Sequence, residues 1–242
     1  MILFVTDFGN DGPYIAQMKA AVRRNGYRGD ILNLFSDIPT YNIRSASVLL
    51  NAYAHDFPEG CVFVSVVDPG VGSNRLPLAI LADGRWYVGP DNGLFELVLR
   101  RATHVEAFKI SWQPARLSAS FHGRDVFAPI AARIARGQGA SLLTPMSIHD
   151  IHRVDWPDDL SEIVYVDHFG NAMTGIENAP GLSGVKIGGE TLPLVRTFSD
   201  VEEGAPLAYI NANGILEISV NQGRADTYFG IEVGDAVTPI WD

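Results

Sequence analysis

The sequence has a single cysteine, Cys61, among 242 residues. One thiol cannot form an intramolecular disulfide, so an apolar core has to stabilise the fold, and a cytoplasmic location is expected. Positive charge is also scarce, because 18 Lys and Arg residues stand against 28 Asp and Glu, which gives a net charge of -10. Proteins that bind the nucleic-acid backbone rely on clustered basic residues, so no nucleic-acid partner is expected.

Long apolar runs are missing as well. The longest have the length of a strand, far below the roughly 20 residues that a membrane-spanning helix needs. The apolar start stops before Asp7 and carries no basic flank, so neither a signal peptide nor a membrane partner is expected. Glycine-rich phosphate motifs, a serine elbow and a His-Glu-x-x-His motif are absent, and the histidines are scattered, so no metal site is expected.

The first 140 residues alternate between apolar runs and helical periodicity, which is typical of an α/β domain with a mainly parallel central sheet. Strands are predicted near 2–5, 30–35, 61–67, 78–81 and 86–88, and helices near 13–22, 43–53, 93–101 and 125–136. A stretch with several glycines and prolines at 140–160 indicates a linker, and short β-rich segments follow it. We therefore expect an α/β domain over residues 1–155 and a small β-sandwich or barrel over residues 160–242.

A carboxylate follows four of the predicted strands, at Asp7, Asp37, Asp68 and Asp91. Ligands of open α/β sheets lie outside the carboxyl ends of the strands, so these side chains are expected along one edge of the sheet. Asp37 and Asp91 are explained as turn residues beside proline and glycine. Asp7 and Asp68 precede glycine-containing turns, where a ligand can approach the backbone, and are the better site candidates.

Two further clusters carry polar and aromatic residues. His122, in Phe-His-Gly-Arg-Asp at 121–125, precedes a predicted helix, whose N-terminal partial charge would keep the imidazole neutral. The alternative is an ordinary loop histidine beside a first-turn acid, Asp125. In Asp-His-Phe-Gly-Asn at 167–171, Asn171 could read the edge of a base on which Phe169 stacks, or the segment could be a plain hairpin turn.

Long motifs over nearly the whole chain point to one protein family. They are TDFGNDGPY at 6–14, VVDPGVGSNR at 66–75, VGPDNGL at 88–94, FHGRDVFAP at 121–129, VDHFGNAMTGI at 166–176 and NGILEISVNQGRA at 213–225. Together and in this order they resemble the S-adenosyl-L-methionine hydroxide adenosyltransferase family. That family is homologous to the fluorinating and chlorinating 5′-halo-5′-deoxyadenosine synthases.

The resemblance implies a fold, an assembly and a reaction. The fold is an N-terminal α/β domain followed by a small C-terminal β-barrel, in a homotrimer with sites at subunit interfaces. The reaction is attack of water or hydroxide at C5′ of S-adenosyl-L-methionine, giving adenosine and methionine without a cofactor or metal. The hydroxide-using branch carries an Asp–Arg–His set, which Asp68, Arg75 and His122 match. The halogenating branch has Tyr at the position of Asp68 and Tyr-Ser in place of His122-Gly123.

The resemblance also implies the substrate contacts, which are Asp7 for the ribose hydroxyls, Asn171 and Phe169 for adenine, and Asp167 and Asp11 for the methionine ammonium. The halogenases hold the carboxylate partly with a Ser-Arg pair, where this chain has Ala212-Asn213. Arg224 is the candidate substitute. The family's Thr-Asn after the adenine-binding asparagine is Thr174-Gly175 here, so that side of the pocket also departs from the pattern.

Three other functions stay open at this point. One is a binding module for S-adenosylmethionine or adenosine without turnover, one is a halogenase, which Asp68 and His122 disfavour, and the third is a metal-dependent phosphohydrolase. For the hydrolase, we expect Asp68 to accept a hydrogen bond from the attacking water, Arg75 to pair with Asp68, and His122 to be the second water contact. Whether Asp68 or His122 is the base stays open.

Overall fold

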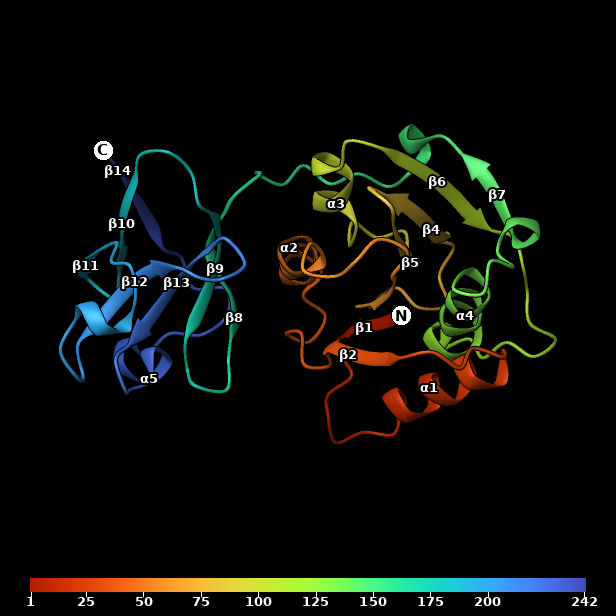
Figure 1. The fold of residues 1–242 in the computed structure, drawn as a ribbon, viewed down its shortest axis with the longest axis horizontal. Helices are drawn as coiled ribbons and strands as arrows, with labels where there is room; N and C mark the ends of the chain where they lie inside the picture. Colours follow the sequence, from red (N-terminus) through yellow and green to blue (C-terminus); the bar gives the residue numbers. More distant parts are fainter. The chain divides into compact units, whose positions relative to one another are not determined.

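The computed structural model describes residues 1–242. The chain divides into two compact units, Met1–Val154 and Asp155–Asp242 (Figure 1). Each unit has its own cluster of buried apolar side chains. None of the helices has the length and apolar character to cross a membrane.

The first unit is built around a seven-stranded sheet in the order β2-β1-β3-β5-β4-β6-β7. The strands are β1 Ile2–Thr6, β2 Ile31–Phe35, β3 Val62–Val66, β4 Pro77–Ala82, β5 Arg85–Pro90, β6 Val105–Ile110 and β7 Leu143–Met146. Strands β2, β1, β3 and β5 are parallel, whereas β4 is antiparallel to both of its neighbours and β7 to β6. The prediction of an α/β fold with a mainly parallel sheet is confirmed.

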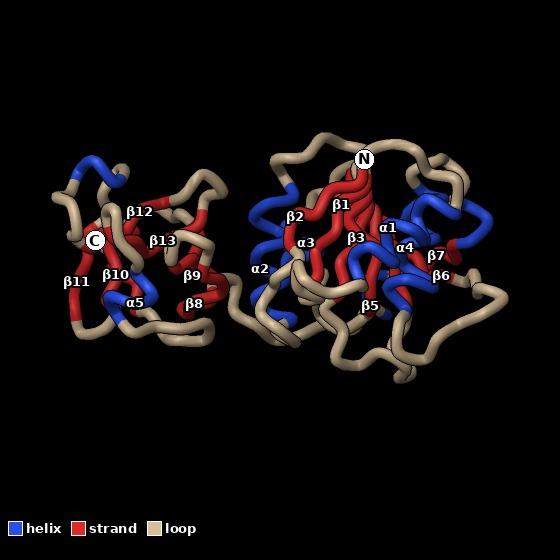
Figure 2. The backbone as a smooth tube through the Cα atoms, turned by 90° about the horizontal axis from the view of Figure 1, so that it is seen from below, coloured by secondary structure: helices blue, strands red, loops and turns tan.

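Helices cover both faces of this sheet (Figures 1 and 2). They are α1 Tyr14–Arg24, α2 Ile43–Ala54, α3 Glu96–Arg101 and α4 Ala128–Ile134, with a π-helical turn, η1 Gly123–Phe127, directly before α4. Helices α1 and α4 contact each other on one face, and α2 and α3 contact each other on the other. Ile15, Met18, Ala21 and Val22 form the buried stripe of α1, at the spacing that an amphipathic helix requires. All residues of β1 and β3 are buried, as in central strands covered on both sides.

The hairpin β4–β5 departs from the simple strand–helix alternation that the sequence suggested. Its two turn residues, Asp83 and Gly84, both have positive φ, 43° and 77°, as a two-residue type I′ turn requires. The short edge strand β7 was also not predicted. It lies within the stretch expected to be a linker, and Pro145 inside it is tolerated because an edge strand leaves one side unpaired.

The second unit contains two antiparallel sheets, in the orders β12-β13-β9-β8 and β11-β10-β14. The strands are β8 Leu160–Val166, β9 Ala172–Glu177, β10 Leu182–Ile187, β11 Glu190–Pro193, β12 Pro206–Ile210, β13 Ile215–Val220 and β14 Thr238–Trp241, and one short helix, α5 Ala225–Phe229, follows β13. The β-rich character expected from the sequence is present, and closure of these sheets into a barrel stays a prediction.

Candidate active site

Asp68, Arg75 and His122 lie together at the carboxyl end of the parallel strands. Asp68 follows β3, Arg75 lies in the loop before β4, and His122 directly precedes η1. Arg75 donates from Nε to Oδ1 of Asp68 at 2.8 Å and from Nη2 to Oδ2. The same Nη2 lies 3.1 Å from Nδ1 of His122. The side chains of Asp68 and Arg75 are only 4% and 8% exposed, so this ion pair is buried, and the half-buried His122 completes the network.

Glycine allows the two loops that carry these residues to meet. Gly72 has a φ of 84°, and a Cβ on it would lie 2.7 Å from the carbonyl oxygen of Ala119. Any other residue at this position would push apart the loop that carries Arg75 and the loop that carries His122. Asp125 orders the second loop, because its Oδ2 accepts a hydrogen bond from the amide of Ser118 at 2.8 Å.

The network determines the protonation of His122. Arginine can only donate hydrogen bonds, so Nδ1 of His122 accepts from Arg75, and the proton of the neutral imidazole is on Nε2. Burial and the guanidinium of Arg75 lower the pKa of His122 from its ordinary value, against the opposing effect of Asp68 and Asp125. His122 is therefore neutral at pH 7, as expected, although the main cause is burial rather than a helix terminus.

We predict that His122 titrates at lower pH than a solvent-exposed histidine. Protonated His122 cannot accept from Arg75, so kcat should be constant above pH 6.5 and fall as the pH drops through the lowered pKa of this residue. An NMR titration, with the His122→Gln spectrum for assignment, measures this pKa. A midpoint at or above the ordinary value of a histidine, or a proton on Nδ1, would contradict the network.

A hollow of about 560 Å³ opens beside Asp68 and His122. Its walls include Phe8, Tyr14 and Phe121, whose rings pack edge-on or tilted against one another at centroid distances of 5.5–5.8 Å. The volume falls in the range of small-molecule sites, and an aromatic wall with a few converging polar groups is typical of such sites.

Asp7 also lines this hollow, at the end of β1. Burial, with a smaller contribution from the charge of Asp68, raises the pKa of Asp7, while the amide of Tyr41 and its own amide act in the opposite direction. The Tyr41 amide donates to Oδ2 of Asp7 at 2.9 Å. Tyr41 has a φ of 62°, unusual for a residue other than glycine, and its exposed ring lines the hollow. No sequence pattern distinguishes Tyr41, which is one tyrosine in a loop.

Asp11 and the two turn aspartates are not brought to the hollow. Asp11 and Asp37 are exposed and do not line it. Asp91 accepts a hydrogen bond from the amide of His152 at 2.9 Å, in keeping with a structural role.

Cys61 is buried in the core. The structure contains no group of three or more His, Cys, Asp or Glu side chains arranged to hold a metal ion.

The remaining predicted residues gather in one corner of the second unit. Asn171 donates from its amide and from Nδ2 to the two carboxylate oxygens of Asp167, at 2.9 and 3.0 Å. Phe169, in the same β8–β9 turn, is 71% exposed. Arg224 donates from Nη2 to Asp226 at 2.7 Å and from Nη1 to the carbonyl of His168 at 2.9 Å. Its Nε also donates to Asp226, so each of its three side-chain nitrogens makes a hydrogen bond. Three of the five N–H groups of the guanidinium are used in this way, which leaves two for a carboxylate ligand.

The fold and this site define an α/β protein with a separate β-rich unit and an Asp–Arg–His network at the carboxyl edge of its sheet. Residues 2–144 match the family model of the SAM hydroxide adenosyltransferase N-terminal domain, and residues 161–238 match that of the C-terminal domain. The chain therefore belongs to the SAM hydroxide adenosyltransferase family, as its motifs predict.

Relatives align over almost the full length. The chain is 39% identical over 252 residues to the (R)-S-adenosyl-L-methionine hydrolase of Thermus thermophilus, covering 96% of each chain. It is 25% identical over 287 residues to a fluorinase of Actinopolyspora mzabensis, covering 98% of this chain and 96% of the fluorinase. A crystal structure of an uncharacterized conserved protein from Thermotoga maritima is similar with a TM-score of 0.89 at 28% identity, covering 99% of this chain and 100% of that one.

Proposed function

We propose that the protein hydrolyses S-adenosyl-L-methionine by adding water at C5′ of the ribose, releasing adenosine and L-methionine. The observation that carries this proposal is the contact of Arg75 with both Asp68 and His122 beside the hollow. Relatives named (R)-S-adenosyl-L-methionine hydrolase, at 29–39% identity, support it, and the fluorinases are more distant at 23–25%.

Asp68 is the base in this proposal. Neutral His122 has no free lone pair, because Nδ1 accepts from Arg75 and Nε2 carries the proton. Each carboxylate oxygen of Asp68 has a second lone pair that Arg75 does not use, and one of these accepts the water proton. His122 then donates from Nε2 and orients the water oxygen. Attack forms the O–C5′ bond and breaks the C5′–S bond. The electron pair goes to sulfur, and the proton goes to Asp68 and then to solvent.

The reaction needs no further catalytic group beyond these contacts. The leaving thioether is neutral and needs no acid, and the positive charge of the sulfonium disappears in the reaction. A positioned base typically contributes about 10²–10⁴-fold, which is about 3–5 kcal/mol. Alignment of water, C5′ and sulfur could contribute up to about 7–11 kcal/mol in ideal cases.

The substrate contacts are part of the same proposal. Asp7 would bind the ribose hydroxyls, Asn171 and Phe169 would bind adenine, and Asp167 would bind the methionine ammonium, with Asp11 and Arg224 as weaker candidates. The two units supply different contacts, which accords with a homotrimer that has its sites at subunit interfaces. Analytical ultracentrifugation tests the trimer.

Two finer features of the fold and setting remain proposals. The β-rich unit would close into a barrel, since single bridges, Glu162–Ala236 and Leu194–Ala208, link its two sheets at both edges. A cytoplasmic location follows from the one free cysteine and is tested by cell fractionation.

The function is tested by incubating the purified protein with S-adenosyl-L-methionine and measuring nucleoside and amino acid. We expect equal amounts of adenosine and methionine, with the same rate after EDTA treatment because no metal takes part. Tight binding without release of methionine would instead identify a binding module. A halogenated nucleoside formed in chloride or fluoride would identify a halogenase, and loss of activity in EDTA would contradict the metal-free mechanism.

A further inference from the structure

A second hollow, of about 300 Å³, borders the Asp68–Arg75–His122 network. His122 lines both hollows, whereas Asp68 lines only the first of the two and Arg75 only the second. The ion pair of Asp68 and Arg75, together with His122, therefore separates the two hollows. All the residues that line them belong to the first unit.

Arg75 carries N–H groups that no atom of the protein accepts. A guanidinium has five N–H groups, and those on Nε and Nη2 are used by Asp68 and His122. Nη1 donates to no protein atom. Because Arg75 lines the second hollow and not the first, the two N–H groups of Nη1 are available to an acceptor in the second hollow.

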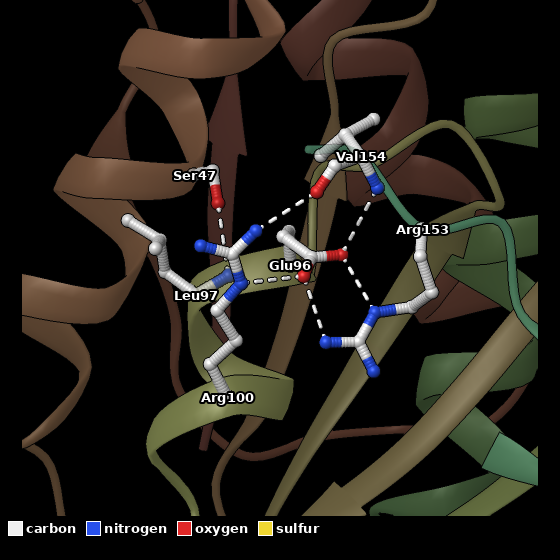
Figure 3. A network of polar contacts seen from close by, with 6 residues as sticks. All are labelled: Ser47, Glu96, Leu97, Arg100, Arg153 and Val154. Atoms are coloured by element: carbon white, nitrogen blue, oxygen red, sulfur yellow. Dashed lines mark hydrogen bonds and ion pairs between the residues drawn. The ribbon is translucent and has the colours of Figure 1, made fainter. Parts of the chain in front are cut away.

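Another buried carboxylate of the first unit, Glu96 at the start of α3, provides a comparison (Figure 3). It accepts from Nη2 and Nε of Arg153, at 2.7 and 2.8 Å. The side chain of Arg153 is 41% exposed, so its remaining N–H groups meet bulk water. The side chain of Arg75 is only 8% exposed, so its remaining N–H groups depend on what the second hollow contains. Buried donors without an acceptor cost free energy, which favours a ligand with an acceptor there.

The second hollow combines positive charge with apolar walls. Lys109 of β6 also lines it and forms no ion pair, and no Asp or Glu does so, although the chain as a whole has a net charge of -10. Its apolar lining includes Ile110, Trp112 and Leu117. The guanidinium of Arg133 packs on the ring of Trp112, 4.4 Å from its centroid. Two cationic groups without an acid favour an anion, and the walls favour an anion with an apolar body.

We propose that the second hollow binds a small monocarboxylate with an apolar body, whose carboxylate is held by Nη1 of Arg75 and by Lys109. The ligand is neither S-adenosyl-L-methionine nor methionine, because the ammonium of an amino acid would meet two cations and no acid. This site is separate from the reaction of the proposed function.

Arg75 connects the second hollow to the first, since its guanidinium contacts Asp68 and His122 as well as the proposed ligand. Burial and the charge of Arg75 lower the pKa of His122. A carboxylate on Nη1 offsets part of that positive charge, so binding in the second hollow should raise the pKa of His122. The ligand is therefore detectable at the network without any turnover.

Calorimetry with benzoate as the probe tests the requirement for charge. We expect saturable binding of benzoate and about tenfold weaker binding of benzamide, which has nearly the same shape and no charge. Inorganic phosphate, an anion without an apolar body, should also bind more weakly than benzoate. Lys109→Met should weaken benzoate binding about tenfold. The matched control is Lys186→Met, which removes the same charge from an exposed position on β10 and should leave the affinity unchanged.

NMR tests the location of the bound probe. Benzoate should shift the indole resonance of Trp112, assigned with Trp112→Phe, and the ring resonances of His122. The rings of Phe8 and Tyr14, which line only the first of the two hollows, should change little. A pH titration with saturating benzoate should give a higher midpoint for His122 than a titration without it.

Four results would overturn the proposed site. They are no saturable binding of benzoate, equal affinity for benzoate and benzamide, equal affinity of Lys109→Met and the unmodified protein, and phosphate binding as tight as that of benzoate. Resonance shifts at Phe8 and Tyr14 without a shift at Trp112 would place benzoate in the first hollow and would also overturn it. Failure of the proposed function is measured separately, as the absence of adenosine release.

Discussion

Asp68→Asn is expected to lower kcat by about 10²–10⁴-fold while the affinity for S-adenosyl-L-methionine stays nearly constant. Asparagine has almost the same shape and can still accept one hydrogen bond from Arg75, but it cannot take a proton from water. Because the neutral imidazole of His122 has no free lone pair, no neighbouring group replaces the lost base. Release of adenosine under saturating substrate measures kcat, and calorimetry measures affinity.

The matched control for this variant is Asp30→Asn, a carboxylate-to-amide change at an exposed position outside the hollow, which should leave kcat unchanged. The comparison variant is His122→Gln. A retained kcat in Asp68→Asn together with a lost kcat in His122→Gln would reverse the assignment of the base. Weak binding by Asp68→Asn would show that Asp68 serves substrate binding and not the chemical step.

Arg75→Met is expected to lower both stability and turnover. It leaves Asp68, whose side chain is 4% exposed, as a buried carboxylate without its partner, which typically costs about 3–5 kcal/mol in the free energy of unfolding. It also removes the donor that orients His122. Urea unfolding followed by tryptophan fluorescence, to which Trp86 and Trp112 of the first unit contribute, measures the change.

The double variant Asp68→Asn/Arg75→Met separates the two effects. Removing the charge of Asp68 should restore most of the lost stability, since the cost comes from an unpaired buried charge, while turnover stays as low as in either single variant. Equal stability of Arg75→Met and the unmodified protein would mean that the ion pair is not buried in solution. Recovery of turnover in the double variant would contradict the assigned roles.

Much of the site was predictable because strand ends in a parallel arrangement meet at one edge. Asp7 and Asp68 follow adjacent strands, so their proximity to the same hollow follows once both strands are recognised. The contacts of Arg75 depend on two loops meeting at Gly72 and Ala119, which no local pattern reveals. Only the family motif brought Arg75 and His122 together before the structure did.

Residues whose importance comes from long-range contacts were missed. Glu96 looks like an ordinary first-turn acid of a helix, and its partner Arg153 is far along the chain. Tyr41 differs from a surface tyrosine only through its φ and its contact with Asp7. The β4–β5 hairpin has a local signal, Asp83-Gly84, but the surrounding alternation of strands and helices favours a mainly parallel sheet and gives no reason to expect an antiparallel pair there.

The most direct test of the reaction is a turnover in water labelled with heavy oxygen, followed by mass spectrometry of both products. Attack of water at C5′ predicts one labelled oxygen in adenosine, at the 5′ position, and none in methionine. Unlabelled adenosine, label in an amino acid product, or a nucleoside that carries halide in place of oxygen would contradict water attack at C5′.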